Sequence, residues 1–249
     1  MRFFWRSPRH LFTGDEAGGA APRRLPTSND VTREPERVLA LPVGEGSAMR
    51  RGMLIVGVQN DFCPGGSVAV AQGDQVAGPL SFLANTVEQA GGLIVAVREW
   101  HSEKSDYFQG AGGDLTPYCV AGTQGAAFHR DLHLSRRARF VFRGGDPRET
   151  GPSAFRSVDR NGLPLASLLA EHHVEHVFVG GIATEREIRA TVMDALRRGL
   201  QVSVVQDGIA SLNARAGAET LHELRLAGAE VVSSGQAIMA LFTNGEARF

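Results

Sequence analysis

The chain has 249 residues, of which 43% are hydrophobic, and this is enough for one large domain with a substantial core. Its formal net charge of −1 gives no reason to expect nucleic acid as a partner. The absence of a long apolar run excludes a membrane-spanning protein, and two cysteines are too few for a disulfide framework. We therefore expect a reduced, cytoplasmic protein with no membrane partner.

Residues 1–52 differ in composition from the rest of the chain. They are rich in Arg, Pro, Gly and Ser and have no sustained apolar periodicity. Residues 1–6, MRFFWR, are basic and aromatic, but their apolar stretch is too short for a signal peptide. We predict a flexible extension or an upstream start before a true start near Met49 or Met53, with a docking arm for a partner or a membrane surface as the alternative.

Residues 53–249 show short apolar runs that alternate with stretches of helical spacing. The predicted strands, in chain order, are residues 53–58, 93–97, 139–142, 174–180, 202–205 and 230–232. The predicted helices are residues 76–90, 163–173, 185–198 and 216–226. This alternation predicts an α/β domain of three layers, in which helices cover both faces of a mainly parallel six-stranded sheet. In such sheets, functional residues follow the carboxyl ends of the strands.

Motifs of one known family stand after the predicted strands. Residues 58–66, VQNDFCPGG, resemble the D-x-Q-N-D-F-x-P-G-G motif of nicotinamidases, and residues 99–101, EWH, resemble the family's D-W-H. Residues 118–126, YCVAGTQGA, resemble H-C-V-x-G-T-x-G-A, and residues 181–187, GIATERE, resemble G-I-A-T-D-x-C. The region of about residues 53–235 is therefore similar to the isochorismatase-like (nicotinamidase-type) cysteine hydrolase family, which implies the isochorismatase-like fold.

The resemblance implies a catalytic triad whose positions carry other residues here. Family amidases use a Cys that attacks the amide carbon, an Asp that takes up its proton and a Lys that favours the thiolate. The corresponding positions are Gly57 for the Asp, Arg143 for the Lys and Glu187 for the Cys. The usual cysteine amidase mechanism is therefore predicted to be absent.

Other residues offer few substitutes for these three. Cys63 and Cys119 lie in motif positions where family members also carry a Cys that does not attack the substrate. Lys104, the only lysine, lies in the long loop after the second strand and is expected on the surface. Asp61 is expected to hold its turn.

The resemblance also implies a ligand site. Phe62 and Trp100 match aromatic walls that enclose a flat ring, and Ile182–Ala183 matches a cis peptide. The backbone N–H groups of Ala183 and Glu187 match the oxyanion hole. The implied substrate-binding residues are Gln59, Phe62, Trp100, Ile182, Ala183 and Thr184. We expect a small aromatic or carboxylate-bearing ligand, and we expect Arg143 to form a bidentate pair with Glu187.

The family's metal site is only partly retained. Glu99 replaces an Asp and His101 is kept, but the other histidines correspond to positions near Ser105 and at Tyr118. One histidine and one carboxylate make a poor zinc or iron site. We predict no required cofactor, with a residual divalent metal at Glu99 and His101 as the alternative.

Several functions remain open from the sequence. The first is a pseudoenzyme that binds a small metabolite or a partner without turnover. The second is a repurposed isochorismatase-like hydrolase, in which Glu187 donates a proton and Arg143 holds the substrate. The third is a non-catalytic subunit that pairs with an active paralogue. Family resemblance also favours a homo-oligomer.

Overall fold

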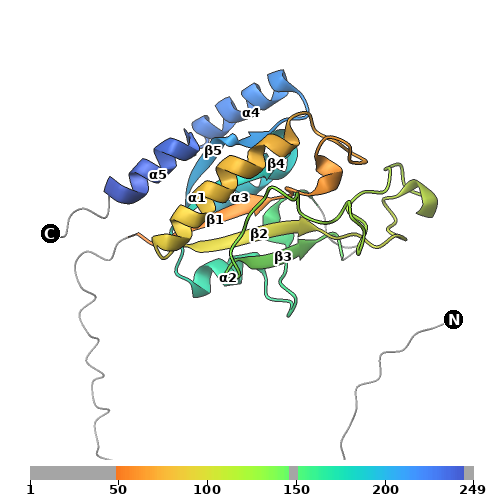
Figure 1. Cartoon of the computed structure of the whole chain (residues 1–249), viewed down its shortest axis with the longest axis horizontal. Helices are drawn as coiled ribbons and strands as arrows, with labels where there is room; N and C mark the ends of the chain where they lie inside the picture. The colour runs from red at the N-terminus through yellow and green to blue at the C-terminus, as the bar shows by residue number, and fades with distance from the viewer. Residues whose placement is uncertain (1–48, 146–150, 244–249) are drawn as a thin grey trace, which may run out of the picture. The chain divides into compact units, whose positions relative to one another are not determined.

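A parallel six-stranded sheet lies at the centre of the fold, in the order β3-β2-β1-β4-β5-β6 (Figure 1). Its strands are Arg51–Val56 (β1), Leu93–Glu99 (β2), Arg139–Arg143 (β3), His176–Ile182 (β4), Gln201–Ala210 (β5) and Glu230–Val232 (β6). Every residue of β4 is buried, as expected for an apolar strand that is covered on both faces. The predicted α/β fold with a mainly parallel six-stranded sheet is confirmed.

Helices cover both faces of the sheet and form two separate apolar cores. One core joins the sheet to α1 (Ala77–Gln89) and α5 (Ser234–Thr243), and the other joins it to α2 (Leu165–Glu171), α3 (Arg189–Arg197) and α4 (Ala214–Leu226). Side chains alternate along β1, so that Met53 and Ile55 face the first core whereas Leu54 and Val56 face the second. The three predicted layers follow from this alternation.

Glycine and asparagine fix two of the helix ends. Gly91, with φ of 81°, follows the last turn of α1, and its N–H donates to Glu88 O at 2.9 Å. A left-handed residue at this place favours glycine. The side chain of Asn213 accepts the N–H groups of Arg215 and Ala216 and thereby caps the start of α4.

Element boundaries differ from the prediction in several places. β1 begins at Arg51, two residues before the predicted strand, and β5 continues to Ala210. The predicted helix 185–198 begins as a π-helical turn, Thr184–Ile188, and continues as α3. The final helix, α5, was not predicted; it packs on the first core through Ala237 and Leu241.

The structure describes residues 49–145 and 151–243, all within one unit, Gly46–Phe249. The predicted extension at residues 1–52 lies almost wholly outside these ranges, so the boundary between extension and domain stays a prediction. In the described ranges, no helix is both long and apolar enough to span a membrane.

Candidate ligand site at the carboxyl end of the sheet

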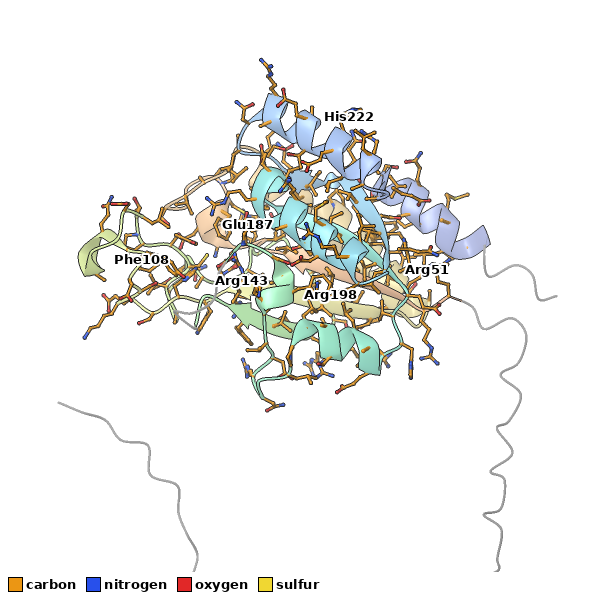
Figure 2. All side chains as sticks on the ribbon, turned by 180° about the vertical axis from the view of Figure 1, so that it is seen from behind. Arg51, Phe108, Arg143, Glu187, Arg198 and His222 are labelled. Carbon is orange, nitrogen blue, oxygen red and sulfur yellow. The ribbon has the colours of Figure 1, made fainter. Side chains whose placement is uncertain are left out.

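The carboxyl ends of β1 to β4 bring the residues of the family motifs together. β1 lies between β2 and β4 at the point where the strand order reverses, which is where open α/β sheets form ligand crevices. Arg143 ends β3, and Glu187 lies five residues after the end of β4. Figure 2 shows these two side chains close to one another. The sequence placed both at strand ends, and the structure brings them into one site.

The backbone just after β1, at Gly57, lies close to the backbone at the end of β4. The peptide bond Ile182–Ala183 is cis, as predicted. Gly57 has φ of 64°, and a Cβ atom on it would lie 2.9 Å from Ile182 O. A side chain at this position therefore meets both an unfavourable backbone conformation and a backbone oxygen.

The Glu187 carboxylate lies against the cis-peptide segment. Its Oε2 accepts the N–H of Ala183 at 3.1 Å, and its side chain is 11% exposed. Its Oε1 lies 3.8 Å from Arg143 Nη2 and 3.6 Å from Arg186 Nε. The carboxylate therefore binds an N–H that the family resemblance assigns to the oxyanion hole.

Arg143 makes its tightest contact with Glu99 rather than with Glu187. Its Nη2 forms an ion pair with Glu99 Oε1, and its Nη1 donates to Gly151 O at 2.8 Å. The separation of 3.8 Å from Glu187 is an ion-pair distance, longer than a hydrogen bond. Arg143 and Glu187 thus form an ion pair as predicted, but the predicted bidentate geometry is wrong, because Glu99 already engages the guanidinium.

Glu99 connects Arg143 to His101. Its Oε2 lies 2.9 Å from His101 Nε2, and the Glu99 side chain is 5% exposed. A Cβ atom on Gly144 would lie 2.3 Å from His101 Cε1, so the backbone at Gly144 packs directly on the imidazole ring. These contacts form a buried polar network of His101, Glu99, Arg143 and Glu187.

Gln59 and Thr184, both predicted to bind substrate, are fully buried and bonded to backbone groups. Gln59 Nε2 donates to Glu99 O and Ala126 O, each at 2.9 Å, and its Oε1 accepts the N–H of Glu99 at 2.7 Å. Thr184 Oγ1 donates to Ala210 O at 3.0 Å. In the structure, these side chains thus position the site, and Gln59 holds Glu99 at the end of β2.

The two predicted aromatic walls lie in different surroundings. Phe62 lines a cavity and its ring lies 5.7 Å from that of Tyr118. Trp100 packs edge-on against Phe142, with ring centroids 6.1 Å apart, and Arg98 lies over its ring. Phe62 is therefore placed to contact a ligand, whereas Trp100 is held by its neighbours.

Two adjoining cavities open at this edge of the sheet. The first, here called the Phe62 cavity, has a volume of about 310 Å³. It is lined by Phe62, Val68, Val70, Asp114, Leu115, Thr116, Tyr118, Ala183, Arg186, Glu187 and Leu212. The second, here called the His101 cavity, has a volume of about 330 Å³. It is lined by Glu99, His101, Tyr107, Leu115, Tyr118, Arg143, Gly144, Gly151, Pro152 and Arg186. Volumes of this order suit a small molecule.

Sequence reasoning missed several residues that line these cavities, among them Arg186 and Tyr107. Arg186 lines both cavities, and it stands between Glu185 and Glu187 inside the motif of residues 181–187. Tyr107 lines the His101 cavity, whereas the prediction had placed a lost histidine position near Ser105. Arg186 occupies the position of the motif that has no fixed residue, and Tyr107 lies in a loop where an alignment shifts easily. No local signal in the sequence therefore marked either residue.

The residues of the His101 cavity do not fit a divalent metal ion. The guanidinium of Arg143 is paired with Glu99, and a resident cation there opposes a second one. Tyr118 also lines this cavity, and burial raises the pKa of its phenol to about 12, with the charge of Glu187 adding to the shift. In the described ranges, no group of three or more His, Cys, Asp or Glu side chains is arranged to hold a metal.

Neither thiol has the properties of a nucleophile. Burial, with a smaller contribution from Asp74, raises the pKa of Cys63 to about 11. Burial, with a smaller contribution from Asp61, also raises the pKa of Cys119 well above its ordinary value. Because the thiolate is the reactive form, a raised pKa keeps both groups mainly as the less reactive thiol at neutral pH. Asp61 instead accepts the N–H of Cys119 at 2.6 Å, which supports its predicted structural role.

Comparisons with known proteins agree with the motifs. Residues 51–236 match the family model described as the Isochorismatase domain. A nicotinamidase/pyrazinamidase of Mycobacterium tuberculosis is 39% identical over 189 residues, which covers 74% of this chain and 99% of that protein. A nicotinamidase of Escherichia coli is 31% identical over 180 residues, which covers 66% of this chain and 84% of that protein.

Solved structures give the same result. Pyrazinamidase of Pyrococcus horikoshii, in complex with zinc, has a TM-score of 0.68 and 30% identity over 74% of this chain and 99% of its own. A protein from L. infantum in complex with nicotinate has a TM-score of 0.61 and 30% identity over 76% of this chain and 95% of its own. By its fold, its motifs and these relatives, the chain belongs to the isochorismatase-like family that includes the nicotinamidases.

Proposed function

We propose that this protein is a pseudoenzyme of the nicotinamidase family that binds a small planar molecule in the Phe62 cavity without cysteine-dependent amide hydrolysis. The observation that carries the proposal is the hydrogen bond from Ala183 N to Glu187 Oε2 at 3.1 Å. Cysteine amidases need a thiolate at that position and a vacant N–H for the developing oxyanion. Here one carboxylate replaces the thiol and occupies the N–H.

The Phe62 cavity supports the binding part of the proposal. Phe62 and Tyr118 contribute aromatic rings, and Val68, Val70 and Leu212 contribute apolar side chains. A cavity that is mostly apolar with a few polar groups is the usual form of a small-molecule site. The relative from L. infantum binds nicotinate, and this supports the expectation of a planar ring without identifying the ligand.

A repurposed hydrolase that uses Glu187 as an acid has less support from the contacts. Glu187 Oε2 acts as a hydrogen-bond acceptor for Ala183 N, and two guanidinium groups lie within 4 Å of Oε1. Arg143, the proposed substrate anchor, is already engaged by Glu99 and Gly151. Pairing with an active paralogue and assembly into a homo-oligomer stay predictions.

Ammonia release and ligand binding together test the proposal. Nicotinamide and pyrazinamide are incubated with the full chain at high protein concentration, and binding of each is measured by calorimetry. We expect saturable binding without ammonia release, because Glu187 stands at the position of the family nucleophile and its carboxylate occupies the N–H of Ala183. Ammonia release by the natural chain that disappears in Glu187→Ala would establish a new mechanism and overturn the proposal.

A further inference from the structure

One oxygen of the Glu187 carboxylate is held by the protein and the other has no hydrogen bond from the described residues. Oε2 accepts the N–H of Ala183 at 3.1 Å. Oε1 lies 3.6 Å from Arg186 Nε and 3.8 Å from Arg143 Nη2. These two cations offset the negative charge of the carboxylate, but both distances are too long for a hydrogen bond. The side chain lines the Phe62 cavity. A ligand in this cavity therefore meets a fixed carboxylate with acceptor capacity to spare.

The charges around the Phe62 cavity disfavour a second carboxylate. Asp114 and Glu187 line it together with one cation, Arg186, so that its ionisable side chains carry a formal charge of −1. Arg143, which the sequence suggested as the group that holds an anionic ligand, lines the His101 cavity and is engaged by Glu99. A ligand carboxylate would also have to compete with Glu187 for the N–H of Ala183. Like charges placed together in a site oppose binding.

We propose that Glu187 makes the Phe62 cavity selective for planar aromatic ligands that present an N–H donor, such as amides or amines, over the corresponding carboxylates. The ligand N–H donates to Glu187 Oε1 while its ring lies beside Phe62 and Tyr118. This inference rests on the proposed function, because it requires that a ligand bind in this cavity. Glu187 is then a specificity-determining residue at the position where the family carries its nucleophile.

A matched pair of ligands tests this selectivity. Dissociation constants of nicotinamide and nicotinate, which differ only in the amide and the carboxylate, are measured by calorimetry on the full chain at pH 7.5. We expect nicotinamide to bind at least about tenfold more tightly, the effect of one hydrogen bond to a charged group. Glu187→Ala frees the N–H of Ala183 and removes the charge, so the preference should fall below about twofold or reverse.

The control is Asp114→Asn, which removes a negative charge from the same cavity without a contact to Ala183. This variant should keep most of the preference for the amide. Thermal unfolding shows whether Glu187→Ala folds. If it does not fold, Glu187→Gln is used in its place. Glutamine can donate a hydrogen bond to a ligand carboxylate, so this variant should also reduce the preference for the amide. Equal binding of both ligands by the natural chain, or an unchanged preference in both Glu187 variants, would overturn the selectivity alone. If neither ligand binds, the selectivity and the proposed function both fail.

Discussion

Removal of the Arg143 guanidinium should strongly destabilise the protein. Its side chain is 11% exposed and that of its partner Glu99 is 5% exposed, so Arg143→Met leaves a buried carboxylate without its cation. Loss of one partner from a buried ion pair costs about 3–5 kcal/mol, since the remaining charge stays desolvated. Glu187 also loses one of its two neighbouring cations.

A double-mutant cycle measures this effect directly. The free energy of unfolding is obtained from urea denaturation of the natural chain, Arg143→Met, Glu99→Gln and the double variant. The double variant should lose less stability than the sum of the single variants, with a coupling of about 0.5–3 kcal/mol. Arg189→Met is the control, because Arg189 is 44% exposed and pairs with Glu223 at the surface, where an ion pair contributes about 0–1 kcal/mol.

Either of two results would refute this reasoning. One is a loss in Arg143→Met no larger than the loss in Arg189→Met. The other is simple additivity of Arg143→Met and Glu99→Gln. Either result alone would mean that Arg143 is not bound into the buried network and remains available to a ligand.

Other predictions concern stability at specific positions. Burial, with Arg51 adding, lowers the pKa of His176 from 6.5 to about 4. The contribution of the neutral imidazole to stability should therefore be fully present above pH 6.5 and be lost as the pH falls toward 4. In urea denaturation, the natural chain should lose about 3 kcal/mol over this range relative to His176→Gln. Parallel pH profiles of the two proteins would contradict this. Gln59→Leu should cost about 3 kcal/mol or more in urea denaturation, because it leaves three buried backbone groups without partners; a loss below about 1 kcal/mol would be evidence against that role. Gly57→Asp should cost about 1–2 kcal/mol for its positive φ and more for the contact with Ile182 O. Gly65→Asp, which has positive φ but open space around it, should lower the melting temperature less, and an equal decrease would show that the contact is unimportant.

The fold follows largely from local sequence patterns. The apolar run at residues 53–58 predicts a buried strand, and β1 occupies most of it because each of its faces packs on one helical layer. Long-range contacts set the boundaries that differ. β5 extends to Ala210 since Ile209 and Ala210 pair with Gly181 and Ile182 across a register shift, and no local pattern at residues 206–210 reveals that pairing.

Some members of the site were predictable from the sequence, but their contacts were not. Motif positions placed Arg143 and Glu187 at strand ends, and the structure brings them within 3.8 Å. The sequence did not reveal that Glu99 takes the guanidinium, because the partner of an arginine depends on side-chain geometry across two neighbouring strands. For the same reason, Gln59 was expected to meet a ligand, whereas its amide bonds to the backbone at the end of β2.

A nuclear magnetic resonance time course of nicotinamide with an equimolar amount of the full chain tests the central claim most directly. The claim is that this family member binds a planar ligand while Glu187 prevents cysteine-type hydrolysis. The account predicts that nicotinamide resonances broaden on binding and that no nicotinate resonances appear over a day. Nicotinate that accumulates in proportion to protein, and that fails to form with Glu187→Ala, would contradict it.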